Sequence, residues 1–88
     1  MTQKIRISLA EMKNDQEGKV VFIIGGRGMK TRLEALGIRR GVKILKLSSF
    51  LGGGPVVVSV GTGEVAIGYG MSRNIIVEVE MDESSFSG

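Results

Sequence analysis

The residues from Gly25 to Thr31 come nearest, in type and spacing, to a phosphate-binding loop. They read Gly-Gly-Arg-Gly-Met-Lys-Thr, follow a β-forming run and open a helical pattern. A Walker A loop needs glycine directly before Lys-Thr, because its backbone amides must wrap the phosphates. Met29 stands in that place, and Thr31 stands where a dinucleotide-binding loop has its last glycine. We therefore interpret the glycines as a strand-to-helix turn whose helix N-terminus would hold an anion only loosely.

Metal binding and nucleophilic catalysis lack their usual residues. The sequence contains no histidine and no cysteine, which are the commonest transition-metal ligands and the usual partners or nucleophiles in covalent catalysis. Carboxylates gather near the C-terminal end at Glu78, Glu80, Asp82 and Glu83, but the first two fit the solvated face of a strand. We expect no catalytic residue, no metal ligand and no cofactor.

The charge of the chain is distributed unevenly. The net charge is +3, and residues 18–46 contain eight basic residues against one acid, Glu34. After Lys46 there is one basic residue, Arg73, against five acids. Such a dipolar molecule is steered towards acidic surfaces. Single-stranded nucleic acid is one such surface, although the three Phe and one Tyr form no aromatic pair on one strand face.

Short β-forming runs separated by turns make up most of the chain. They predict strands at 19–24, 42–47, 56–60, 64–69 and 75–79, and a short edge strand at 1–7. Strict alternation places Val20, Phe22 and Ile24 on one face, with Phe22 in the core. The same rule places Tyr69 on a face with Val65, at the end of its strand.

One short helix is expected after Gly26. Met29, Leu33 and Leu36 recur at helical spacing and should share one face. Gly37 follows where a left-handed C-cap residue is needed, and Ile38 can then touch Leu33 in a Schellman ending.

Polar residues mark a second helical turn and a solvated strand face. Ser8 is expected to N-cap a single turn, with Glu11 completing a capping box. Lys43 and Lys46 interrupt the apolar pattern of the strand at 42–47, so we expect part of one face there to contact water.

These elements predict a small closed barrel, which would remove exposed sheet edges. The expected fold is mainly β, with five to six strands and one short α-helix between the first and second main strands, covering one open end. Residues 1–80 are expected to form a single domain. Residues 81–88 are expected to be a short acidic, disordered tail.

The stretch from Arg32 to Ile44 reads Arg-Leu-x-x-Leu-Gly-Ile-x-x-Gly-x-x-Ile and resembles the signature of the FeoA family. The similarity extends to the Ser-Leu-Ala-Glu-Met lead-in at 8–12 and to the glycine-proline loop, hairpin and final strand at 52–79. It covers nearly the whole chain. FeoA proteins are small proteins of bacterial and archaeal ferrous iron uptake, and the resemblance implies an SH3-like barrel.

The resemblance implies a non-enzymatic cytoplasmic accessory protein that docks on the cytosolic G domain of the FeoB ferrous iron permease and modulates its assembly or nucleotide cycle. The membrane would be reached only through the permease, and no specific nucleic acid is expected. The expected contact residues are basic or apolar: Arg27, Met29, Lys30, Arg39, Arg40, Phe50 and Leu51.

Two of these assignments leave alternatives open. Met29 fits either an exposed apolar anchor or a core residue. Phe50 and Leu51 either await a partner or fold back over the barrel mouth. The alternative function is a small basic barrel that binds single-stranded nucleic acid.

Overall fold

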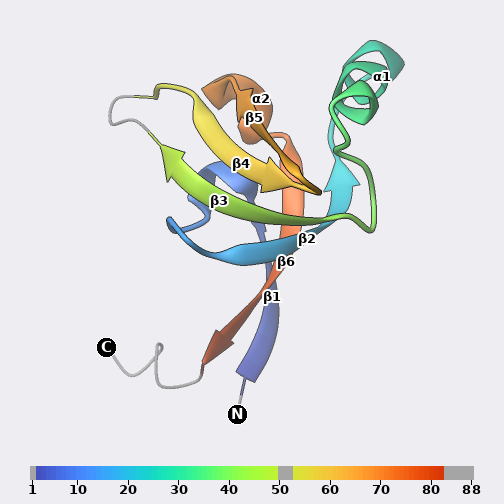
Figure 1. Ribbon diagram of the computed structural model, residues 1–88. Coiled ribbons are helices and arrows are strands. Elements are labelled where there is room, and N and C mark those ends of the chain that lie inside the picture. The colour runs from blue at the N-terminus through green and yellow to red at the C-terminus, as the bar shows by residue number, and fades with distance from the viewer. Residues whose placement is uncertain (1, 50–52, 83–88) are drawn as a thin grey trace.

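The computed structural model describes residues 2–49 and 53–82 and shows a mainly β chain with little helix (Figure 1). Its elements, in chain order, are β1 (Thr2–Ser8), the 3₁₀ turn η1 (Leu9–Glu11), β2 (Glu17–Ile23), α1 (Arg27–Ala35), β3 (Lys43–Ser49), β4 (Val56–Val60), β5 (Gly63–Ile67), α2 (Tyr69–Ser72) and β6 (Ile75–Asp82). The predicted fold class, with the helix between two main strands, is confirmed.

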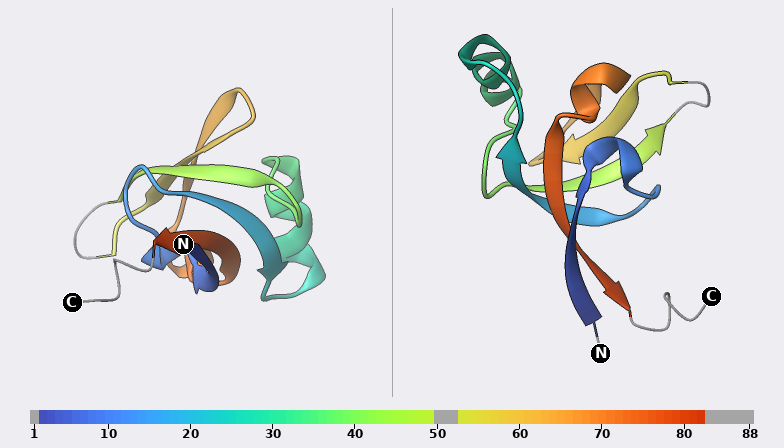
Figure 2. Two further views of the ribbon diagram at one scale, coloured as in Figure 1. Left: turned by 90° about the horizontal axis from the view of Figure 1, so that it is seen from below. Right: turned by 180° about the vertical axis from the view of Figure 1, so that it is seen from behind.

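All six strands belong to one antiparallel sheet, in the order β1-β6-β2-β3-β4-β5. β6 lies between β1 and β2, and its ladder with β1 runs from Thr2 opposite Asp82 to Ser8 opposite Ile76. The sheet curls around the core, and the β1–β6 ladder extends away from the end that carries α1 and α2 (Figures 1 and 2). β1 and β5 are the two edges of this sheet. The barrel is therefore a curled sheet, and its edge strands do not pair with each other to close the ring that the sequence predicted.

A β-bulge in β2 changes which side chains enter the core. The pairing of β2 with β6 shifts register between Val20 and Phe22, and an extra residue at such a shift reverses the alternation that follows it. Val20 and Ile23 are therefore buried, whereas Phe22 is 51% exposed and Ile24 is also exposed. The prediction that Phe22 lies in the core, on a face with Val20 and Ile24, is wrong.

The strand β5 ends earlier than predicted. It stops at Ile67, and Tyr69 begins the short helix α2 with Gly68 as its N-cap. Tyr69 is consequently 42% exposed. The prediction that it continues the buried strand face is wrong.

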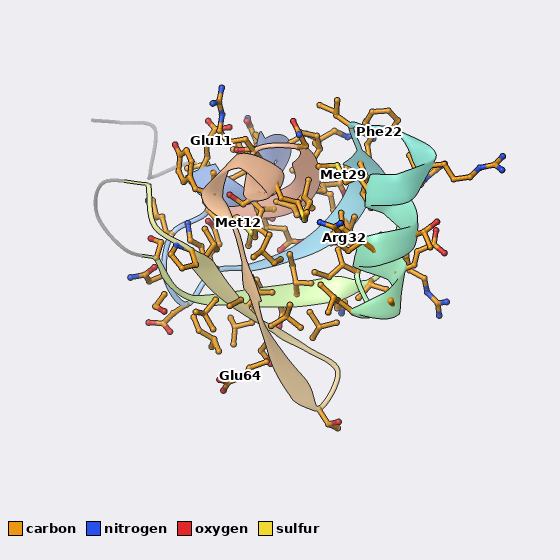
Figure 3. All side chains as sticks on the ribbon, turned by 90° about the horizontal axis from the view of Figure 1, so that it is seen from above. Glu11, Met12, Phe22, Met29, Arg32 and Glu64 are labelled. Atoms are coloured by element: carbon orange, nitrogen blue, oxygen red, sulfur yellow. The ribbon has the colours of Figure 1, made fainter. Side chains whose placement is uncertain are left out.

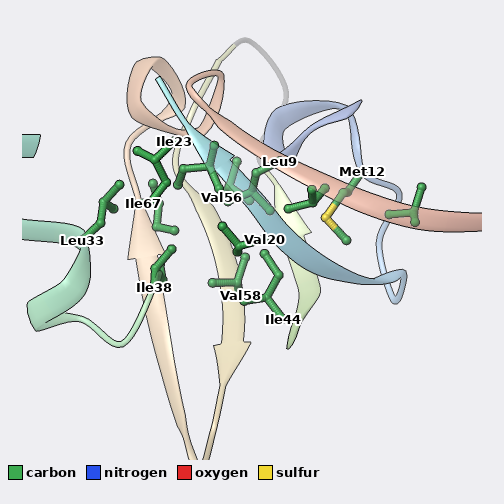
Figure 4. Close-up of a cluster of buried hydrophobic side chains, with 13 residues drawn as sticks. Leu9, Met12, Val20, Ile23, Leu33, Ile38, Ile44, Val56, Val58 and Ile67 are labelled. Carbon is green, nitrogen blue, oxygen red and sulfur yellow. The ribbon is translucent and has the colours of Figure 1, made fainter. Parts of the chain in front are cut away.

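The core is a cluster of thirteen buried apolar residues, nearly all supplied by the strands and η1 (Figure 4). α1 adds only Leu33 to this cluster, while Met29 is partly buried and packs against it. Leu36 is 41% exposed, because it is the C-cap residue and no longer follows the helical turn. Met29 therefore lies on the core side of α1, and the prediction that Leu36 shares its face is wrong.

The C-terminus of α1 has the predicted Schellman ending. Gly37 has φ +89°, its N–H donates to the carbonyl of Glu34 at 2.9 Å, and the Ile38 N–H donates to the carbonyl of Leu33 at 2.9 Å. Leu33 and Ile38 are both fully buried. The cap therefore joins the helix to the core at the point where the chain leaves it.

Two glycine substitutions test how α1 is held. Gly37→Ala should lower the free energy of unfolding by about 1–2 kcal/mol, because a side chain disfavours the left-handed conformation. Gly28→Ala, in the helix and with open space for a Cβ, should instead raise it by about 0.5–1 kcal/mol. Denaturant unfolding of the two variants measures both changes. Equal effects of the same sign would contradict this account of the cap.

Candidate functional site

The predicted contact residues divide between two segments and one region that the structure does not describe. Arg27, Met29 and Lys30 lie in the first turns of α1, and Arg39 and Arg40 lie in the turn that precedes β3. The predicted contacts Phe50 and Leu51 lie outside the described residues.

A cleft of about 330 Å³ separates α1 from the end of β2. We call it the α1–β2 cleft, and it is lined by Phe22, Ile23, Lys30, Glu34, Arg39 and Arg40. It thus brings together three of the predicted contact residues, while Arg27 and Met29 do not line it. Phe22 is labelled beside the first turn of α1 in Figure 3, and Met29 lies on the side of the helix that faces the sheet.

A glycine turn and two backbone hydrogen bonds position the segments that line this cleft. Gly25, at φ +148°, turns the chain from β2 into α1; a Cβ there would collide with the side chain of Met29. At the other wall, the Gly41 N–H donates to the carbonyl of Val20 at 2.7 Å, and the Val20 N–H donates to the carbonyl of Val42 at 2.9 Å. The turn that carries the two arginines is therefore fixed to β2 at the residue where the bulge begins.

The α1–β2 cleft carries an excess of positive charge. Lys30, Arg39 and Arg40 are exposed, and the single carboxylate of the lining is that of Glu34. Among the side chains described, those of residues 2–49 and 53–81, the one ion pair joins Arg6 to Glu78 at 3.7 Å, and neither residue lines this cleft. The three cations thus form no ion pair among the described side chains and outnumber the one carboxylate, so the cleft can attract an anionic partner.

Two exposed apolar side chains, one near the end of β2 and one directly after the strand, were not predicted from the sequence. Phe22 and Ile24 are among the large exposed apolar residues of the described chain, and they are exposed because the bulge reverses the alternation. The pairing with β6 that produces the bulge gives no recognisable local pattern in β2 itself. The exposure of Phe22 beside the three cations of the cleft, with Ile24 exposed two residues later, makes this surface suited to binding another protein.

A second, larger cleft lies between β2 and the β1–β6 ladder, with a volume of about 620 Å³. Its charges balance, because its lining holds three lysines and three glutamates: Lys4, Lys19, Lys43, Glu17, Glu78 and Glu80. A surface that neutralises itself in this way gives a charged partner little net attraction. The α1–β2 cleft is therefore the better candidate.

Lys46 is buried rather than solvated, and the prediction for this residue is wrong. It is 2% exposed, and its ammonium donates hydrogen bonds to the carbonyls of Leu9 at 3.4 Å, Ala10 at 3.1 Å and Met12 at 2.5 Å. Burial lowers the pKa of Lys46. Lys43, in contrast, is exposed as predicted. The buried ammonium thus satisfies the carbonyls at the end of η1.

The same turn begins with the predicted capping box. The N–H of Ser8 donates to Oε1 of Glu11 at 3.1 Å, and both halves of the box are present. Hydrogen bonds from the backbone and side chain of Ser8 lower the pKa of Glu11. η1 is therefore fixed at both ends by side chains, Glu11 at its start and Lys46 at its end.

Neither a metal centre nor a membrane-spanning helix is found in the described part of the chain. The side chains of residues 2–49 and 53–81 include no group of three or more acidic, histidine or cysteine residues placed to hold a metal ion. Over these residues, no helix has the length and apolar character needed to cross a membrane.

A family model and a solved structure identify the family of this chain. A model of the FeoA domain matches residues 7–79. A crystal structure of an iron uptake regulatory protein (FeoA) is 32% identical with a TM-score of 0.77, and the match covers 88% of this chain and 99% of that one. No curated protein matches the chain.

Two further structures share the fold at lower identity. The FeoA protein from Chlorobium tepidum is 24% identical with a TM-score of 0.79, over 93% of this chain and 79% of that one. FeoA from Stenotrophomonas maltophilia, complexed with zinc, is 21% identical with a TM-score of 0.69, over 81% of this chain and 88% of that one. It is described as a procaryotic SH3 domain protein proposed to act as a ferrous iron transport activating factor.

Replacement of the buried lysine tests its structural role. Lys46→Met keeps most of the volume but removes the donor, so the free energy of unfolding should fall by about 1–3 kcal/mol, the cost of unsatisfied buried acceptors. Lys43→Met, on the same strand but exposed, should change it by no more than about 0.5 kcal/mol. Denaturant unfolding compares the two. A Lys46→Met protein as stable as the wild type would show that the three hydrogen bonds make no net contribution to the free energy of unfolding.

Proposed function

Because this chain belongs to the FeoA family, we propose that it is a non-enzymatic cytoplasmic accessory protein of ferrous iron transport. It docks on the cytosolic G domain of the FeoB permease and modulates the assembly or the nucleotide cycle of that permease. The family membership supplies the link to ferrous iron transport. The G domain as partner, the modulation and the cytoplasmic location are the further steps of this proposal.

The observation that carries the docking proposal is the α1–β2 cleft. It collects Lys30, Arg39 and Arg40 from two segments of the chain around an apolar floor. Protein interfaces commonly combine an apolar centre with a charged rim, and arginine is enriched in them. The basic rim favours an acidic surface on the partner, which it would also steer during encounter.

Binding of single-stranded nucleic acid is the second candidate. The exposed ring of Phe22 beside basic groups is one stacking platform of the kind that such proteins use. Tyr69, the other exposed aromatic of the described chain, lies on α2 and does not line the cleft. A single exposed ring beside the carboxylate of Glu34 is weaker support for nucleic-acid binding than the whole cleft is for protein docking.

Charge reversal at the cleft tests the proposal. Arg39→Glu combined with Arg40→Glu should abolish measurable binding to the FeoB G domain, a loss of about a hundredfold or more, because like charges at an interface cost several kcal/mol. Isothermal titration calorimetry at physiological salt measures the affinity.

The matched control is Lys4→Glu combined with Lys13→Glu, which makes the same change in net charge at exposed positions outside the α1–β2 cleft. It should bind almost as the wild type does. Equal losses in both double variants would reduce the effect to net charge, and wild-type affinity of the arginine variant would remove the arginines from the contact surface.

A further inference from the structure

We propose that the α1–β2 cleft receives an apolar side chain carried by an acidic segment of a partner protein, and that Phe22 is its main contact. This inference rests on the proposed function only for the identity of the partner. The chemistry of the occupant is argued from the cleft itself.

The floor of the cleft is apolar and open to solvent. Phe22 is 51% exposed while it lines the cleft with Ile23, and the next residue, Ile24, is exposed as well. A phenyl ring held at the edge of a concave surface is the type of group that becomes an energetic anchor when a partner excludes water from it. An apolar side chain of the partner therefore fits this floor better than a charged one.

The rim of the cleft selects for negative charge around that side chain. Lys30 comes from α1 and the two arginines, Arg39 and Arg40, come from the turn before β3, so two segments of the chain supply cations beside the apolar floor. Arginine binds carboxylates in bidentate geometry. Carboxylates that flank the apolar side chain in the partner would thus meet the cations that line the cleft.

Glu34 argues against a continuous polyanion. It lies four residues after Lys30 on α1, so both side chains lie on one face of the helix, and both line the cleft. A phosphate backbone following this wall would meet a carboxylate directly after the cation. An acidic protein segment, which carries its charges at separate side chains, can place them at the three cations and leave Glu34 uncontacted.

Three features join the segments around the cleft to the rest of the fold. Fully buried Leu33 fixes α1, the Schellman ending fixes the exit from the helix, and the Gly41–Val20 hydrogen bond fixes the arginine turn. These contacts set where Lys30, Arg39 and Arg40 lie relative to β2.

The test uses fluorescence anisotropy with three labelled peptides and the full chain. The first peptide, Asp-Glu-Leu-Phe-Glu-Asp, carries both features; the second, Asp-Glu-Ser-Ser-Glu-Asp, keeps only the charge; the third, Asn-Gln-Leu-Phe-Gln-Asn, keeps only the apolar pair. The first should bind at least about tenfold more tightly than either of the others, the effect expected of a buried anchor. Equal affinity for the first two peptides would overturn the proposal.

Phe22→Ala should weaken binding of the first peptide by about tenfold or more. The matched control is Tyr69→Ala, which removes a similarly exposed aromatic ring from α2 and should leave the affinity unchanged. Because Phe22 is half exposed, its replacement should leave the fold intact, and an amide spectrum checks this. Lys30→Glu gives a second variant that should also lose binding. Wild-type affinity of a folded Phe22→Ala protein would contradict the proposal.

Two further measurements on the same variants test other occupants of the cleft. Binding of a labelled single-stranded oligothymidine that Phe22→Ala weakens, with no binding of the first peptide, would assign the cleft to nucleic acid and overturn the proposal. Self-association in sedimentation velocity that Phe22→Ala abolishes would assign it to a second copy of this chain, with the same consequence.

Binding to the FeoB G domain distinguishes a failure of this inference from a failure of the proposed function. If the G domain binds the wild type and Phe22→Ala equally well, docking stands and the cleft is not its contact, which overturns the inference. If the first peptide binds in a Phe22-dependent way and the G domain does not bind, the inference stands and the proposed partner is wrong.

Discussion

The interaction on which the rest of the structure depends is that of the buried ammonium of Lys46 with the carbonyls at the end of η1. It joins the middle of β3 to a turn 34–37 residues earlier in the chain. The backbone of Lys46 is bonded as well, its N–H to the carbonyl of Gln16 and its carbonyl to the N–H of Asp15. One residue therefore holds the whole connection from β1 to β2 against the sheet. A buried charge without these acceptors would be strongly destabilising, so the turn and the lysine require each other.

The charges around the α1–β2 cleft are used differently. There the cations of the α1–β2 cleft are exposed and belong to no ion pair within the described residues. Backbone features hold that region together: the bulge after Val20, the Schellman ending at Gly37 and the hydrogen bond from Gly41. Charge that is not used to stabilise the fold stays available to a partner. This division supports a docking function at the end that carries α1.

Features governed by local rules could be predicted from the sequence, and features governed by distant pairing could not. The Schellman ending and the capping box depend on residues three to five positions apart, and both are present. The exposure of Phe22 depends on how β2 pairs with β6, more than fifty residues later, so strict alternation misplaced it. Lys46 looked like a solvated strand residue because its acceptors lie far away in the sequence. The cations of the candidate site were therefore predicted, and its apolar floor was not.

The central claim is that this protein docks through the α1–β2 cleft, and amide chemical-shift mapping tests it most directly. The isotope-labelled protein is titrated at physiological salt with the FeoB G domain and, separately, with a mixed single-stranded oligonucleotide. The account predicts shifts with the G domain only, clustered at residues 22–24, 30–34 and 39–40. Shifts with the oligonucleotide alone, weakening steeply as salt rises, or G-domain shifts centred on the cleft beside Lys4 and Glu78, would contradict it.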